Sequence, residues 1–169
     1  MATGNTVFEQ AMADYASWDG KGQAPAFPLY NGEAVALVDR FPKFLGQVVI
    51  FPRRGFSGDD VSMFDLPTPI SQAVDLVTHT IGRHMSKLFE GVRIIRHDEG
   101  YAVPNHPHTV LFPAGRGEGA RLYEPSQFHP DEGYFDSMRE LLALSERQTS
   151  LLDEKLGELL LSSGLHDPT

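Results

Sequence analysis

The sequence contains no cysteine, which excludes disulfides, thiolate metal sites and cysteine nucleophiles. It also lacks any apolar run near the roughly 18 residues that a membrane-spanning helix requires. Residues 1–8 carry neither the basic region nor the apolar core of a signal peptide. We therefore expect a protein of the cytoplasm that uses no membrane.

Basic residues are scarce toward the C-terminal end of the chain. The net charge of the 169 residues is −9, and residues 118–169 hold four Lys and Arg against eleven Asp and Glu. A uniformly acidic surface repels nucleic acid, so we expect no nucleic-acid partner. The nearly balanced residues 1–117 can still carry a local anion site, whereas the acidic part suits solubility or a basic partner.

Hydrophobic periodicity divides the chain into a series of helices and strands. Helices are predicted over residues 7–18, 71–89 and 134–161. Strands are predicted over residues 34–38, 48–51, 92–96 and 109–112, the first two as an antiparallel pair. Loops are predicted over residues 20–28, 55–70, 97–105 and 114–133. This order predicts an α+β domain with an antiparallel sheet, a long central helix and an additional long C-terminal helix.

We divide the chain into an N-terminal helix and loop (1–29), a sheet domain (30–115), and an irregular segment with the C-terminal helix (116–169). The last helix carries one seam of residues spaced three or four apart, with Ser145 as its weak point. The seam consists of Met138, Leu142, Thr149, Leu152, Leu156 and Leu159. A narrow stripe of this kind predicts packing within the chain or a dimer, or else a separate partner surface.

Two histidines begin the fourth predicted strand, in the segment NHPHTVLFP at residues 105–113. Because side chains alternate along a strand, we expect His106 and His108 on the same face of the sheet. Imidazole is neutral for much of the time at pH 7, so it can act as a nucleophile, a base or a metal ligand. These three chemistries stay open on the residues alone.

This segment resembles the active-site strand of the histidine-triad superfamily, in which three histidines alternate with apolar residues. His106 and His108 fill the first two positions, and Val110 stands at the third. The His-Pro-His form is also similar to the galactose-1-phosphate uridylyltransferase branch. Upstream, AVALVDRFP (34–42) followed by GQVVIFPRR (46–54) is similar to the paired strands of the family. The resemblance covers about residues 30–115, and it identifies the sheet domain as histidine-triad-like.

The resemblance implies a nucleotide hydrolase or nucleotidyltransferase. In such an enzyme, His108 attacks an α-phosphorus to form a covalent nucleotidyl-histidine, and His106 supports the attack and helps to hold the phosphate. It further implies that Asp39 contacts the ribose and that Asp98 takes the place of a polar Asn of the family. The implied substrate is a purine nucleotide ester, amidate or anhydride, or a dinucleoside polyphosphate, and the implied assembly is a homodimer. Attack by a histidine requires no metal cofactor, although Mg²⁺ can accompany polyphosphates.

Further residues are candidates for holding the nucleotide because of their chemistry. A phosphodiester anion needs fixed donors or cations around its equatorial oxygens, and an apolar ring can cover a base. The candidates are Arg53, Arg54, Arg116, Phe41 and Asn105.

Val110 motivates the first alternative, since a valine cannot donate a hydrogen bond to a phosphate. The chain is then a nucleotide-binding or scaffold module without catalysis. The second alternative is a metal-binding His-x-His protein, in which His97 or Asp98 supplies a third ligand. In the favoured interpretation no residue binds a metal.

Overall fold

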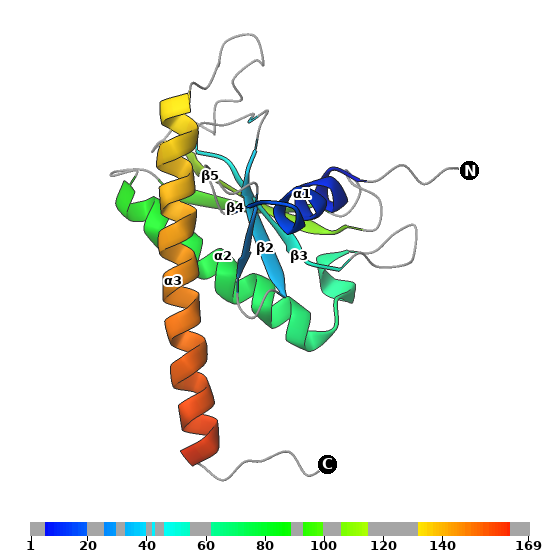
Figure 1. Ribbon diagram of the computed structural model, residues 1–169, viewed down its shortest axis with the longest axis vertical. Helices are drawn as coiled ribbons and strands as arrows, with labels where there is room; N and C mark the ends of the chain where they lie inside the picture. The colour runs from blue at the N-terminus through cyan, green and yellow to red at the C-terminus, as the bar shows by residue number, and fades with distance from the viewer. Residues whose placement is uncertain are drawn as a thin grey trace, which may run out of the picture.

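The structure is a computed structural model with a five-stranded sheet at its centre (Figure 1). It describes residues 6–19, 26–29, 33–39, 42, 46–54, 62–88, 93–99, 106–114 and 132–162, without the side chains of residues 88, 114, 134 and 149–162. The strands are β1 (Phe27–Leu29), β2 (Ala34–Val38), β3 (Val48–Pro52), β4 (Arg93–Glu99) and β5 (His108–Ala114). The helices are α1 (Val7–Ala16), the 3₁₀ turn η1 (Met63–Asp65), α2 (Thr68–Leu88) and α3 (Glu132–Ser162).

The strands lie in the order β1-β2-β3-β5-β4, and every neighbouring pair is antiparallel. β2 and β3 form the predicted pair, in which Val35 lies opposite Phe51, and Gly46 adopts a φ of 78° in the turn before β3. β5 enters the sheet between β3 and β4. The prediction of an α+β fold with an antiparallel sheet and two long helices is therefore confirmed.

One face of the sheet packs against α2 and α3 and holds the larger hydrophobic core. The β-strand side chains of this core include Ala36, Val48, Ile50 and Leu111. Helix α2 contributes the apolar stripe at three- and four-residue spacing that the sequence predicts, and α3 contributes Met138, Leu141 and Leu142. Most of these side chains are fully buried, so this face forms the main interior of the protein.

The other face of the sheet packs against α1, which lies on the opposite side from α3 (Figure 1). Phe8 is the fully buried residue of α1, and it packs with Val35, Val49 and Phe51 of the sheet. The helix begins with a capping box, in which the Thr6 hydroxyl accepts from the Glu9 amide while the Glu9 carboxylate accepts from the Thr6 amide. Local hydrogen bonds therefore fix the start of the helix, two residues before Phe8.

The structure corrects several predicted boundaries. Residues 27 and 28 fall in a predicted loop, but Phe27–Leu29 forms β1, whose place at the sheet edge tolerates Pro28. β4 extends to Glu99, so residues 97–99 are strand rather than loop. Residues 63–65 form a turn of 3₁₀ helix inside a predicted loop, and α2 begins three residues before the expected Ser71.

One further boundary differs from its prediction, and two other predictions are not tested by the described residues. β5 continues one residue beyond the predicted stop at Pro113. The predicted irregular segment at 114–133 lies mostly outside the described residues. The division of the chain at residues 29 and 115 stays a prediction.

Ser145 does not weaken the α3 seam, because it forms a polar contact between α2 and α3. Its hydroxyl donates to the Leu141 carbonyl at 3.0 Å and lies 2.8 Å from His84 Nδ1 of α2. Ser145 is fully buried together with its seam neighbours Met138 and Leu142. The C-terminal half of α3 runs on beyond the other elements (Figure 1). No described helix is long and apolar enough to cross a membrane.

Candidate functional site

His106 and His108 lie together on the sheet face that α1 covers. The Phe8 ring meets both imidazoles edge-on, with centroid distances of 5.7 Å to His106 and 5.1 Å to His108. Phe51 of β3 meets His106 in the same manner at 6.4 Å. Both histidines are buried, at 3% and 5% exposure. The structure thus places the two histidines on one face, as the alternation of the strand predicts.

A backbone contact fixes the orientation of the His108 ring. His108 Nδ1 lies 3.1 Å from the carbonyl oxygen of His106. A carbonyl oxygen only accepts, so Nδ1 carries the proton and donates it. In the neutral imidazole the lone pair is then on Nε2. This tautomer makes Nε2 the nitrogen that can act as a nucleophile, and the two-residue spacing of the histidines supplies the acceptor.

Glu99 is a site residue that the sequence analysis missed. In the register of β4 and β5, Glu99 pairs with His108, so both side chains leave the sheet on the same face. Glu99 Oε2 lies 3.4 Å from His108 Nε2, and Glu99 Oε1 lies 3.4 Å from His97 Nε2. The segment RHDE looks like a charged loop, and only its continuation of the VRIIR strand signals that Glu99 shares a face with His97.

Asp98 lies on the opposite face of the sheet from His108. It pairs with Thr109, whose hydroxyl donates to Asp98 Oδ1 at 2.6 Å. Arg96 Nε also donates to Asp98 at 2.9 Å, and Arg96 Nη1 reaches Asp75 of α2 at 2.7 Å. Partial burial works to lower the pKa of Arg96, but these two acidic partners outweigh it and raise the pKa. The geometry does not bring Asp98 to the histidines.

Asp39 follows β2 and accepts a hydrogen bond from Gln47 Nε2 at 2.6 Å. Through β3 the register relates this end of β2 to Leu111, whereas His108 begins β5. Asp39 and His108 therefore lie at different ends of the ladder, two strands apart.

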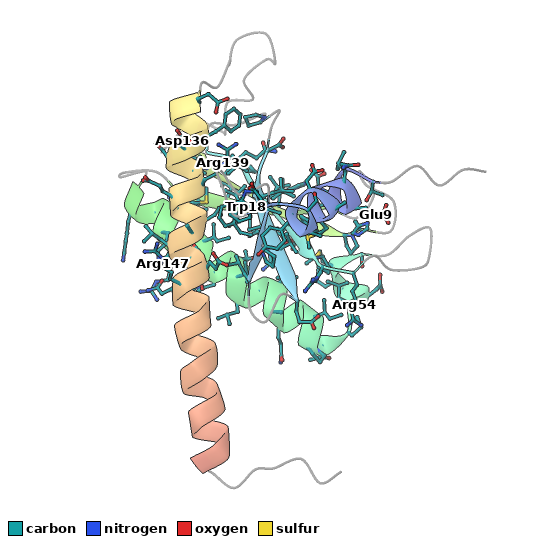
Figure 2. All side chains as sticks on the ribbon, viewed as in Figure 1. Glu9, Trp18, Arg54, Asp136, Arg139 and Arg147 are labelled. Carbon is teal, nitrogen blue, oxygen red and sulfur yellow. The ribbon has the colours of Figure 1, made fainter. Side chains whose placement is uncertain are left out.

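The predicted arginines of β3 lie nearer to the histidines. Arg53 and Arg54 directly follow β3, and the antiparallel register sets the end of β3 beside the start of β5. Both are exposed. Figure 2 shows Arg54 well apart from Arg139 and Arg147 on α3. The candidates Phe41, Asn105 and Arg116 lie outside the described residues.

Among the residues that the structure describes, no three His, Asp or Glu side chains are arranged to hold a metal ion. The alternative of a metal-binding His-x-His protein stays a prediction. His97 and His108 face one carboxylate, that of Glu99.

No protein-family model matches the sequence, and no curated protein matches it. Among solved structures, the chain is similar to a Hit-like protein involved in cell-cycle regulation from Bartonella henselae. The identity is 16% over 67% of this chain and 80% of that chain, and the TM-score is 0.49. It is also similar to a hypothetical histidine triad nucleotide-binding protein from Sulfolobus tokodaii strain7. There the identity is 15% over 69% and 79%, and the TM-score is 0.49.

A diadenosine triphosphate hydrolase from Plasmodium falciparum is similar at 12% identity over 86% of this chain and 98% of that chain, with a TM-score of 0.44. The first two structures are histidine-triad proteins by name.

Proposed function

We propose that the protein is a nucleotide hydrolase or nucleotidyltransferase that works through a covalent nucleotidyl-histidine at His108. The observation that carries the proposal is the hydrogen bond from His108 Nδ1 to the His106 carbonyl, because it leaves the lone pair on Nε2. Nε2 attacks the α-phosphorus, a bond from nitrogen to phosphorus forms, and the bond to the leaving oxygen or nitrogen breaks. Water or another acceptor then attacks the same phosphorus, loses its proton and releases the imidazole.

The surroundings of His108 support an anionic substrate such as a nucleotide. Phe8 and Phe51 are buried and stacked on each other, so neither ring offers an open face to a base. Arg53 and Arg54 supply positive charge at the adjoining end of β3. We propose a purine nucleotide ester, amidate or dinucleoside polyphosphate as the substrate, with Mg²⁺ accompanying a polyphosphate. We also propose that the protein acts as a homodimer.

Intact mass spectrometry after incubation with adenosine phosphoramidate and diadenosine polyphosphates tests the mechanism. A nucleotidyl-sized adduct or product is expected for the wild type and for His79→Ala, an exposed histidine of α2 that serves as the control. Neither is expected for His108→Ala. If His108→Ala retains full turnover, the mechanism is wrong.

A nucleotide-binding module without catalysis is the second candidate. Two observations favour it: Val110 supplies no hydrogen-bond donor at the third position of the motif, and Phe8 covers His108. Removal of one preorganised donor costs about 10²–10³ in rate, which is enough to abolish useful turnover. Nucleotide binding without product or adduct in the same experiment would identify this function.

A further inference from the structure

Three ionisable side chains form a chain of contacts beside the candidate nucleophile. The two carboxylate oxygens of Glu99 each lie 3.4 Å from an imidazole nitrogen, one of His97 and one of His108. The side chains become more exposed away from the sheet centre, from 6% for His108 through 31% for Glu99 to 61% for His97. One carboxylate therefore lies between two imidazoles and is partly exposed to solvent.

His97 lies beside the position at which the histidine strand lacks a donor. It pairs with Val110 in the register of β4 and β5, so the two side chains share the face that carries His108. Val110 has no polar atom, whereas the His97 ring carries an N–H. The neighbouring strand thus places an imidazole next to the site of the missing one.

We propose that His97 donates to the substrate's phosphate beside the nucleophile His108, and that the Glu99 carboxylate occupies the place of this phosphate until the substrate displaces it. The inference rests on the proposed function, and it names two residues of that same site, one as a second phosphate donor and one as an internal competitor. A carboxylate and a phosphate both offer paired anionic oxygens, so the N–H of His97 can donate to either group.

The position of Glu99 also requires that it move before His108 can react. Attack needs the Nε2 lone pair to face phosphorus, yet Nε2 faces Glu99 Oε2 in the structure. A phosphate placed against His108 Nε2 meets the Glu99 carboxylate, and the two anions repel each other. Glu99 is partly exposed, so its side chain can turn toward solvent when the phosphate enters. His97 then donates to a phosphate oxygen instead of to Glu99.

Calorimetric titration with AMP tests the inference without requiring turnover. His97→Ala is expected to weaken AMP binding about tenfold, because it removes one donor to a charged group. Glu99→Gln is expected to strengthen AMP binding about tenfold, because it keeps the shape of the side chain and removes the competing charge. His79→Ala, an exposed histidine on the opposite side of the sheet, is the matched control and is expected to bind as the wild type does.

A second variant tests the placement of the donor. In the His97→Ala background, Val110→His is expected to restore most of the lost affinity, since both positions face the same site. An AMP affinity that is unchanged in His97→Ala, or lowered in Glu99→Gln, overturns the inference, as does a wild type that binds no AMP. Failure of the proposed function alone appears differently, as AMP binding that depends on His97 without any adduct or product.

Discussion

Phe8 stacks face to face on Phe51, with ring centroids 4.2 Å apart and 10° between the ring planes. The two residues come from the first helix and the third strand, so the contact ties α1 to the middle of the sheet. Phe8 also makes T-shaped ring contacts with both candidate histidines. The stack therefore couples the docking of α1 to the enclosure of His108.

We expect Phe8→Ala to lower the free energy of unfolding by about 3 kcal/mol, through the loss of buried surface and the cavity that remains. The same change uncovers His108, which should then react faster with diethyl pyrocarbonate. Urea unfolding and mass spectrometry of the modified histidines measure the two effects. Val7→Ala is the control, because Val7 is 67% exposed on the same helix. Equal histidine reactivity in both variants would contradict the covering role of Phe8.

Thr109→Val tests whether the sheet face opposite the histidines contributes to nucleotide binding. Thr109 is fully buried, and its hydroxyl donates to Asp98 on the face away from His108. Its replacement leaves a carboxylate without this donor and should cost about 1–2 kcal/mol of stability. AMP affinity should remain within about twofold of the wild type, because nothing changes on the histidine face. A large loss of AMP binding in a folded Thr109→Val protein would show that Asp98 takes part in the site after all.

His84 and Ser145 should show coupled effects on stability. The Ser145 hydroxyl donates its proton to the Leu141 carbonyl. The hydroxyl oxygen of Ser145 therefore accepts from His84 Nδ1 across the contact of α2 with α3. A double-mutant cycle with His84→Ala and Ser145→Ala is expected to give a coupling free energy of about 1 kcal/mol. Additive effects of the two changes would mean that the contact between α2 and α3 rests on apolar packing alone.

Glu146 gives the stability a pH dependence of known sign. Burial raises the pKa of its carboxyl group, and the nearby Arg147 only partly opposes this shift. The folded protein therefore binds this proton more tightly than the unfolded chain, and stability falls as the pH rises from the ordinary carboxyl range through the folded pKa. Glu146→Gln should remove this fall and be more stable at neutral pH by less than about 1 kcal/mol.

Urea unfolding of wild type and Glu146→Gln at about pH 4 and about pH 8 measures the difference, since an ordinary Glu ionises between them. A variant that is less stable than the wild type at the higher pH would reverse the sign and refute the assignment.

Periodicity predicts the helices and the central strands because their apolar side chains alternate with the correct spacing. It finds only the first part of β4 and misses residues 97–99, whose side chains are polar or charged and largely exposed, as is common at a sheet edge. This error conceals the contact of Glu99 with His108 and the pairing of His97 with Val110. It also fails for β1, which is only three residues long and has a proline at its centre. Pairing with β2, rather than a pattern within these residues, makes the segment a strand.

The candidate site is predictable only in part. The spacing of His106 and His108 is sufficient to place both on one face. The position of Asp98 is decided by one residue of register, which sends it to the other face and Glu99 to the site. The contact of Phe8 with the histidines joins the start of the chain to β5, and no local pattern encodes such a distant contact.

The central position of β5 has a consequence for the order of folding. β3 lacks β5, its second neighbour in the sheet, until α2 and β4 have been synthesised, because Val48 pairs with Leu111. Distant pairings of this kind slow folding, and an unpaired strand edge invites association with other chains. A nascent or truncated chain that ends before residue 108 therefore exposes β3 as an open edge. The strand that carries the candidate nucleophile thus also covers the edge of β3, and the step that assembles the site removes this open edge.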